Sequence, residues 1–267
     1  MRALLLAALF FTMTPLLISL QWLLDKLHLP GWGAISNNYY RVLRRVLGVK
    51  LRVVGQPVRD RPVLFVSNHV SWVDIIVIGS IMPIAYIAKR EVRDWPLVGI
   101  TAKLQRTVFV DRTRRHQTAE AVADIVRTLN GGTSVVLFAE GTSSDGNHVL
   151  PFRSALLGAI KHAATHASEA SNILIQPMSI CYTALYGIPM GRQHRPLVAW
   201  YGDLDFMPHI KTFVDRAAVD AVVSFGEPVR AGGATDRKIM TRQLEGTIRR
   251  TTAAALCGRP LPARAAE

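Results

Sequence analysis

Short runs of apolar residues, rich in valine and isoleucine, alternate with longer amphipathic segments from residue 51 onward. Short apolar runs between turn residues are typical of buried strands, and apolar positions spaced three or four apart are typical of helices. The runs predicted as strands are 51–54, 63–67, 85–88, 107–110, 134–139, 173–180, 197–201 and 221–225. The segments predicted as helices are 71–81, 91–104, 117–129, 153–167 and 235–256. This alternation predicts an α/β fold, in which a mixed, largely parallel sheet is flanked by helices.

The first part of the chain has a different pattern, because residues 3–24 carry no charge. A membrane crossing needs about 20 mostly apolar residues, so this run is long enough. Pro15 interrupts the run and favours two short helices that enter the lipid and return. We expect a retained N-terminal membrane anchor, either spanning or monotopic. A cleaved signal peptide is the alternative, although no small-residue cleavage site follows closely.

Charge supports a membrane contact. The chain has 32 Lys and Arg against 19 Asp and Glu, a net charge of +13. Several of the cations follow the apolar run, namely Lys26, Arg41, Arg44, Arg45, Lys50 and Arg52. Positive residues stay on the cytoplasmic side of a membrane, so we expect the body on the cytoplasmic face of the inner membrane. A solvated helix face is the alternative. The parts expected are the anchor and basic interfacial helix at 1–48, the body at 49–257 and a tail at 258–267.

Several classes of protein are disfavoured. Cys181 and Cys257 are 76 positions apart and outside any paired motif, so neither a disulfide scaffold nor a cysteine zinc site is expected. We expect both to be buried. Nucleic-acid binding would suit the charge, but no aromatic–basic RNA motif or recognition-helix pattern is present. His162 and His166 have a spacing that suits a metal, yet no third ligand is indicated. The sequence therefore predicts no metal and no cofactor.

One candidate for chemistry lies where the strand 63–67 ends. His69 follows this strand, and Asp74 comes five residues later. Histidine is the side chain best suited to proton abstraction near neutral pH, and a carboxylate on its second ring nitrogen fixes the tautomer. A histidine with a structural role at a helix start is the alternative. His69 and Asp74 are therefore a candidate catalytic pair.

A second candidate is the loop after the strand 134–139. Glu140 is followed by small and polar residues, Gly141, Thr142, Ser143 and, after one more serine, Asp145. Such a loop can present N–H groups to an oxyanion while the carboxylate orients a polar group of the substrate. An ordinary strand-to-loop turn is the alternative. Lys89 and Arg112 also follow predicted strands and are candidates for the same sheet edge, or else solvated surface cations.

Taken in order, these motifs resemble the phospholipid/glycerol acyltransferase family, whose members include 1-acylglycerol-3-phosphate acyltransferases. The resemblance covers roughly residues 50–230. It rests on Asn68-His69-x4-Asp74 (the HX4D motif), Phe109-x-x-Arg112, Phe138-x-Glu140-Gly141-Thr142 and Pro177. It implies transfer of a fatty acyl chain from acyl-carrier protein or acyl-CoA to the hydroxyl of a lysolipid acceptor, and makes 49–257 the acyltransferase domain. It also implies that His69 and Asp74 are catalytic. The residues implied to bind the acceptor are Lys89, Arg112, Glu140, Gly141 and Thr142.

Departures from the family pattern point to one branch. Members that act on glycerol phosphates typically read Phe-Pro-Glu-Gly-Thr-Arg, whereas this chain has Ala139 and Ser143 in place of the proline and arginine. Loss of that arginine removes a bidentate phosphate clamp. The motif instead resembles the lyso-ornithine lipid O-acyltransferase branch, which acylates a free 3-hydroxyl, and Asp145 is a candidate partner for the ornithine ammonium. Acylation of 1-acyl-sn-glycerol-3-phosphate to phosphatidic acid is the alternative.

The mechanism expected is direct transfer, with His69 as general base for the acceptor hydroxyl. An acyl-enzyme on Ser71 is a less favoured route within the enzyme class. Outside that class, the rival is a non-catalytic membrane adaptor, which predicts no acyl transfer and no effect of changes at His69 and Asp74.

Overall fold

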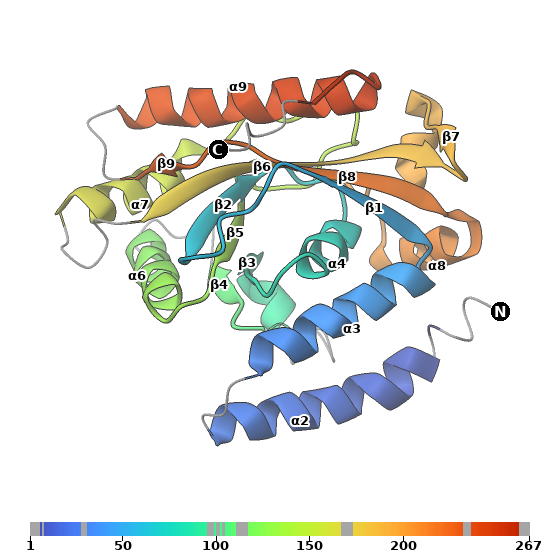
Figure 1. The fold of residues 1–267 in the computed structure, drawn as a ribbon, viewed down its shortest axis with the longest axis horizontal. Coiled ribbons are helices and arrows are strands. Elements are labelled where there is room, and N and C mark those ends of the chain that lie inside the picture. The colour runs from blue at the N-terminus through green and yellow to red at the C-terminus, as the bar shows by residue number, and fades with distance from the viewer. Residues whose placement is uncertain are drawn as a thin grey trace.

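The computed structural model describes residues 6, 8–27, 31–94, 99, 102, 105–110, 117–166, 173–231 and 236–261. Its centre is a twisted sheet with helices on both faces (Figure 1). The long helix α9 (Arg237–Leu256) lies over one face, and α3 (Trp32–Val46) lies on the opposite side with α2 (Thr14–Lys26) outside it. The predicted α/β layers are confirmed.

The sheet is mixed but largely parallel. The strands of the described residues are β1 (Val49–Val54), β2 (Val63–Ser67), β3 (Ala85–Lys89), β4 (Val108–Val110), β5 (Val135–Phe138), β6 (Leu174–Leu185), β7 (Ile188–Pro189), β8 (Val219–Phe225) and β9 (Val229–Arg230). Their order is β1-β8-β6-β2-β5-β3-β4, with β7 and β9 also paired to β6. β6 pairs in antiparallel fashion with β7, β8 and β9. The remaining pairs, including β2 with β6 and β1 with β8, are parallel. The parallel strands place several strand ends at one edge of the sheet.

Side-chain alternation along the strands gives the two larger hydrophobic cores of the described residues, one on each face. Phe65 points to the core formed with α3, α4 (Val73–Gly79) and α8 (Phe206–Arg216). Leu64 points to the core formed with α6 (Gln117–Asn130), α7 (Ser154–His166) and α9. Every residue of β2 is buried, as expected for a central parallel strand covered on both faces.

The N-terminal segment forms a short π-helix, η1 (Leu9–Met13), followed by α2. Pro15 is the second residue of α2, where the first turn of a helix tolerates proline, so it does not split that helix. α2 is held on α3 by a hydrogen bond of 2.8 Å between the Thr14 and Tyr39 hydroxyls. Large apolar side chains remain exposed on this segment: Phe11, Met13, Leu16, Leu20, Trp22, Leu23 and Leu27. Within the part of the chain that the structure describes, every helix is too short or too polar to cross a membrane.

Two further expectations, the strand at 197–201 and the burial of Cys257, are wrong. Residues 197–201 do not form a strand; the 3-10 helix η4 (Arg192–Leu197) precedes an irregular segment there, in which the main-chain N–H groups of Val198 and Ala199 both donate to the carbonyl of Arg195. The segment expected as a helix at 91–104 begins as a 3-10 helix, η2 (Arg90–Asp94); Gly99 and Ala102 are helical, and the rest of the segment lies outside the described residues. Cys257 is exposed, whereas Cys181 is buried as expected.

Candidate active site

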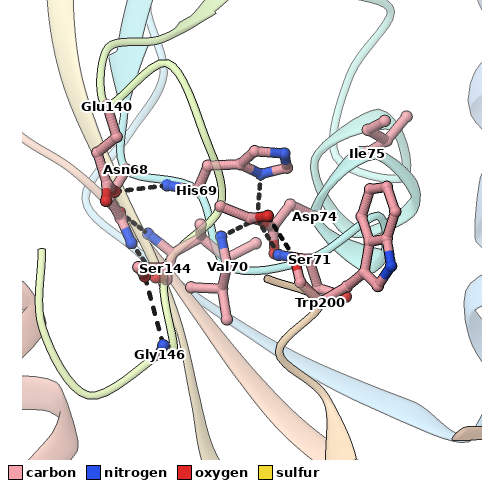
Figure 2. Close-up of polar contacts among 12 residues, drawn as sticks. Asn68, His69, Val70, Ser71, Asp74, Ile75, Glu140, Ser144, Gly146 and Trp200 are labelled. Atoms are coloured by element: carbon pink, nitrogen blue, oxygen red, sulfur yellow. Dashed lines mark hydrogen bonds and ion pairs between the residues drawn. The ribbon is translucent and has the colours of Figure 1, made fainter. Parts of the chain in front are cut away.

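The parallel pairing of β2 and β5 brings the two motifs of the sequence together. Ser67 and Phe138, the last residues of these strands, are register partners. His69 and Glu140 each follow two residues later and meet across the sheet edge, where the His69 N–H donates a hydrogen bond of 2.8 Å to Glu140 Oε1. Figure 2 shows Glu140 and Asp74 on opposite sides of the His69 backbone.

His69 and Asp74 form a closely bonded pair. His69 Nδ1 lies 2.8 Å from Asp74 Oδ2, and the same oxygen accepts the N–H groups of Val70 at 2.7 Å and Ser71 at 3.0 Å (Figure 2). Asp74 is fully buried in the first turn of α4, whereas 18% of the His69 side chain is exposed. Because Asp74 accepts at Nδ1, the proton of a neutral ring lies there, and Nε2 is left with a lone pair. This arrangement suits a general base.

The ring of His69 is also fixed by stacking. It lies on the ring of Phe138 with centroids 4.0 Å apart and an interplanar angle of 17°. Phe138 in turn stacks on Tyr86, whose hydroxyl donates to the carbonyl of Ile75 in α4. The imidazole is therefore restrained on one face by an aromatic layer and at Nδ1 by a carboxylate.

Asn68 performs a structural task that the motif alone does not reveal. Its amide donates to the carbonyl of Ile180 at 2.8 Å, and its oxygen accepts the N–H of Ile180 at 2.9 Å. The last backbone pair between β2 and β6 is Ser67 with Met178, so the Asn68 side chain continues the pairing beyond the end of β2. The main chain of His69 is thereby released from β6 and can bond to Glu140.

Glu140 is bonded to the main chain. It is 2% exposed, and its second carboxylate oxygen accepts the N–H of Leu150 at 2.9 Å. Burial raises the pKa of Glu140 to about 7, against the lowering effect of its hydrogen bonds from His69 and Leu150. Its carboxylate therefore connects the segment that carries His69 to the far end of the following loop. The acceptor-binding role expected for it stays a prediction.

The loop 141–147 closes against the same segment. Gly141 has a φ of 75°, and its N–H donates to the carbonyl of Phe138 at 3.1 Å, so this particular group is engaged within the turn. The Ser144 N–H donates to the carbonyl of His69 at 2.8 Å. Ser143 Oγ donates to the carbonyl of Trp200, in the segment wrongly expected to be a strand. The loop therefore lies beside His69, as Figure 2 also shows for Ser144.

Asp145 stabilises its own turn. Its carboxylate accepts the Asn147 N–H at 2.8 Å, the Asn147 side-chain amide at 3.0 Å and the His148 N–H at 3.3 Å. Burial raises the pKa of Asp145, but these hydrogen bonds outweigh that effect, so its pKa lies below the usual value. Asp145 is therefore anionic at neutral pH; it is partly exposed, and its Oδ2 lies 3.8 Å from Nδ1 of His148. Its expected role as a partner for the ornithine ammonium stays a prediction.

The structure describes the remaining predicted site residues to different extents. Thr142 is exposed on the same loop. Lys89 is the last residue of β3, and its side chain lies outside the described part. Arg112 lies outside the described residues. Sequence reasoning did not find Tyr182, whose hydroxyl donates to Asp74 Oδ1 at 2.7 Å, because it comes from β6, 108 residues away from Asp74.

Comparisons with known proteins identify the family and support the fold. A family model described as Acyltransferase matches residues 50–181. The crystal structure of the 1-acyl-sn-glycerophosphate (LPA) acyltransferase from Thermotoga maritima has a TM-score of 0.58 and 23% identity, covering 85% of this chain and 80% of that one, which shows a shared fold. The chain belongs to the Acyltransferase family and is an O-acyltransferase, as the sequence motifs predicted.

Within that family, two bacterial relatives of one name are the most informative. The lyso-ornithine lipid O-acyltransferase of Brucella abortus (strain 2308) is 46% identical over 247 residues, which are 92% of this chain and 92% of that protein. The lyso-ornithine lipid O-acyltransferase of Rhizobium meliloti (strain 1021) is 40% identical over 225 residues, or 84% of this chain and 77% of that protein. The predicted resemblance to this branch is confirmed.

Proposed function

We propose that this enzyme transfers a fatty acyl chain to the 3-hydroxyl of lyso-ornithine lipid and so makes ornithine lipid. The observation that carries this proposal is the similarity to the Brucella abortus enzyme over 92% of both chains. Ser143 supports it, because its hydroxyl is bonded to the Trp200 carbonyl at the position where phosphate-specific members have an arginine. Unlike an arginine, a serine at this position offers no positive charge to a phosphate.

The chemistry follows from the geometry of the His69 pair. Nε2 of His69 takes the proton from the acceptor hydroxyl while that oxygen forms a bond to the thioester carbonyl carbon. Asp74 stabilises the imidazolium that results, through the bond at Nδ1. The tetrahedral intermediate then collapses, the carbon–sulfur bond breaks, and the imidazolium returns its proton to the departing thiol. The products are the ester and the free thiol, with no net change in the enzyme.

The acyl donor is acyl-carrier protein or acyl-CoA in this proposal, and the resemblance to the ornithine-lipid branch favours the carrier protein. Either donor is anionic and suits a chain of charge +13. We place the enzyme on the cytoplasmic face of the inner membrane. Exposed apolar residues of η1 and α2, such as Phe11, Leu16 and Trp22, suit monotopic insertion, and basic residues of α3 suit anionic lipid heads.

The test uses membranes that contain the protein, labelled acyl-carrier protein or acyl-CoA, and either lyso-ornithine lipid or 1-acyl-sn-glycerol-3-phosphate. We expect ornithine lipid as the product, with turnover in His69→Ala lowered by about 100-fold or more. The matched control is His162→Ala, an exposed histidine on α7, which should retain activity. Exclusive formation of phosphatidic acid would overturn the acceptor, and normal turnover in His69→Ala would overturn the mechanism.

A further inference from the structure

Tyr182 is a buried tyrosine that bonds directly to Asp74. It lies on β6, is 3% exposed, and donates a hydrogen bond of 2.7 Å to Asp74 Oδ1. The other carboxylate oxygen already accepts His69 Nδ1 and the N–H groups of Val70 and Ser71. Among the described residues, Tyr182 is therefore the fourth hydrogen-bond partner of the Asp74 carboxylate and the one that engages Oδ1.

The strand β6 places this tyrosine beneath α4. Along β6, side chains alternate between the two faces, and Tyr182 shares the α4 face with Met178 and Ile180. Ile180 is the residue held by Asn68, so the strand is anchored to the His69 segment two residues before Tyr182. The pairing of β6 with β8 shifts register between Tyr182 and Ala184. Such an irregularity redirects side chains at the point where it occurs.

The phenol acts as a donor across the working range of pH. Burial and the neighbouring charge of Asp74 raise the pKa of Tyr182 well above its usual value. The hydroxyl therefore stays protonated, and a protonated phenol facing a carboxylate must donate. A hydrogen bond to a charged group is stronger than one between neutral groups, so part of the negative charge of Asp74 is drawn toward Oδ1.

We infer that Tyr182 is a positioning residue that holds the Asp74 carboxylate and moderates how strongly it attracts the proton of His69. The inference rests on the proposed role of His69 as general base. With the Tyr182 donor removed, the charge of Asp74 is balanced less at Oδ1 and stabilises the protonated imidazole more. The neutral, reactive form of His69 then requires a higher pH, and its ring is oriented by a carboxylate with one fewer restraint.

Other titratable groups near the pair belong to the elements packed around it. Asp74 influences Glu140 after β5, Tyr86 on β3 and Cys181 on β6, as well as Tyr182 itself. Burial raises the pKa of Glu140 to about 7, which lies within the range of a pH–rate profile. Its titration is removed by carrying out the same comparison in a Glu140→Gln background.

The experiment measures kcat and kcat/KM against pH for Tyr182→Phe with the acceptor that the wild-type enzyme uses. We expect kcat to fall about tenfold with KM nearly unchanged, and the acid limb of the profile to move up by roughly half to one pH unit. The matched control is Tyr40→Phe. Tyr40 is also buried, but its hydroxyl donates to Gln105 away from the His69 pair, so its pH profile should match the wild type.

A second variant works in the opposite direction. Difluorotyrosine at position 182 keeps the ring and is a stronger donor, so it should move the acid limb to lower pH. Unchanged profiles in both variants, with only a loss of thermal stability, would overturn the inference and leave Tyr182 a core residue. His69→Ala separates this outcome from the proposed function. If that variant is inactive while the Tyr182 variants behave as wild type, only the role of Tyr182 fails.

Discussion

Replacing Glu140 by glutamine should make the free energy of unfolding less dependent on pH. Glu140 is 2% exposed, and burial raises its pKa from 4.5 to about 7. Between these two values the folded chain keeps a proton that the unfolded chain releases, so stability falls as pH rises through this window. Since each tenfold change in a proton equilibrium is worth about 1.4 kcal/mol, the wild type loses roughly 3 kcal/mol by pH 7.

Glutamine resembles the protonated form of Glu140. Both are neutral, and in both one terminal atom is a carbonyl oxygen that accepts a main-chain N–H while the other carries hydrogen. The variant should therefore match the wild type near pH 4.5 and exceed it in stability by up to about 3 kcal/mol above pH 7.

Urea unfolding followed by tryptophan fluorescence, repeated from pH 4.5 to 8, measures the difference. The matched control is Glu120→Gln, an exposed glutamate on α6. Parallel stability curves for wild type and Glu140→Gln would refute the reasoning.

Three further predictions concern the pair, the sheet edge and the membrane. Asp74→Asn should lower kcat at least about 100-fold in the transfer assay while the thermal transition remains cooperative, and wild-type turnover would contradict the pairing with His69. Asn68→Ala should lower the free energy of unfolding by about 2–4 kcal/mol in urea, because two buried hydrogen bonds to β6 are lost; a change below 0.5 kcal/mol would argue against them. Leu16→Glu with Leu20→Glu should release the protein from sedimenting anionic vesicles, whereas the exposed Ile239→Glu on α9 should not; equal retention would argue against insertion of α2.

The part of the fold that local patterns encode was predictable from the sequence. Strands such as β2 and β5 were expected at nearly their observed positions, because continuous apolar runs mark buried strands. The apolar pattern at 197–201 looks equally strand-like. The chain there is irregular, however, and the main-chain N–H of Trp200 donates to the carbonyl of Val70. The helix α8 was not expected. Short apolar runs do not by themselves distinguish a strand from a segment buried in another way.

The same limit applies to the site. The contact between His69 and Asp74 could be predicted from the sequence, because the two residues are only five positions apart. The partners that hold them, Asn68 through Ile180 and Tyr182, depend on where β6 lies, and no local motif reports that. Glu140 was found for its charge, yet both its oxygens bond to main-chain N–H groups, a use that only the folded loop reveals.

The bond between Asn68 and Ile180 has a consequence for how such a site can change over time. A histidine whose own backbone is paired in a sheet would change position with its strand. A one-residue shift in the register of that strand turns every side chain to the opposite face. Here one amide side chain substitutes for a peptide group at the last step. The sheet and the reactive segment are thus joined at this step by a side chain, so position 68 can be substituted while the backbone pairing of β2 with β6 up to Ser67 and Met178 is kept.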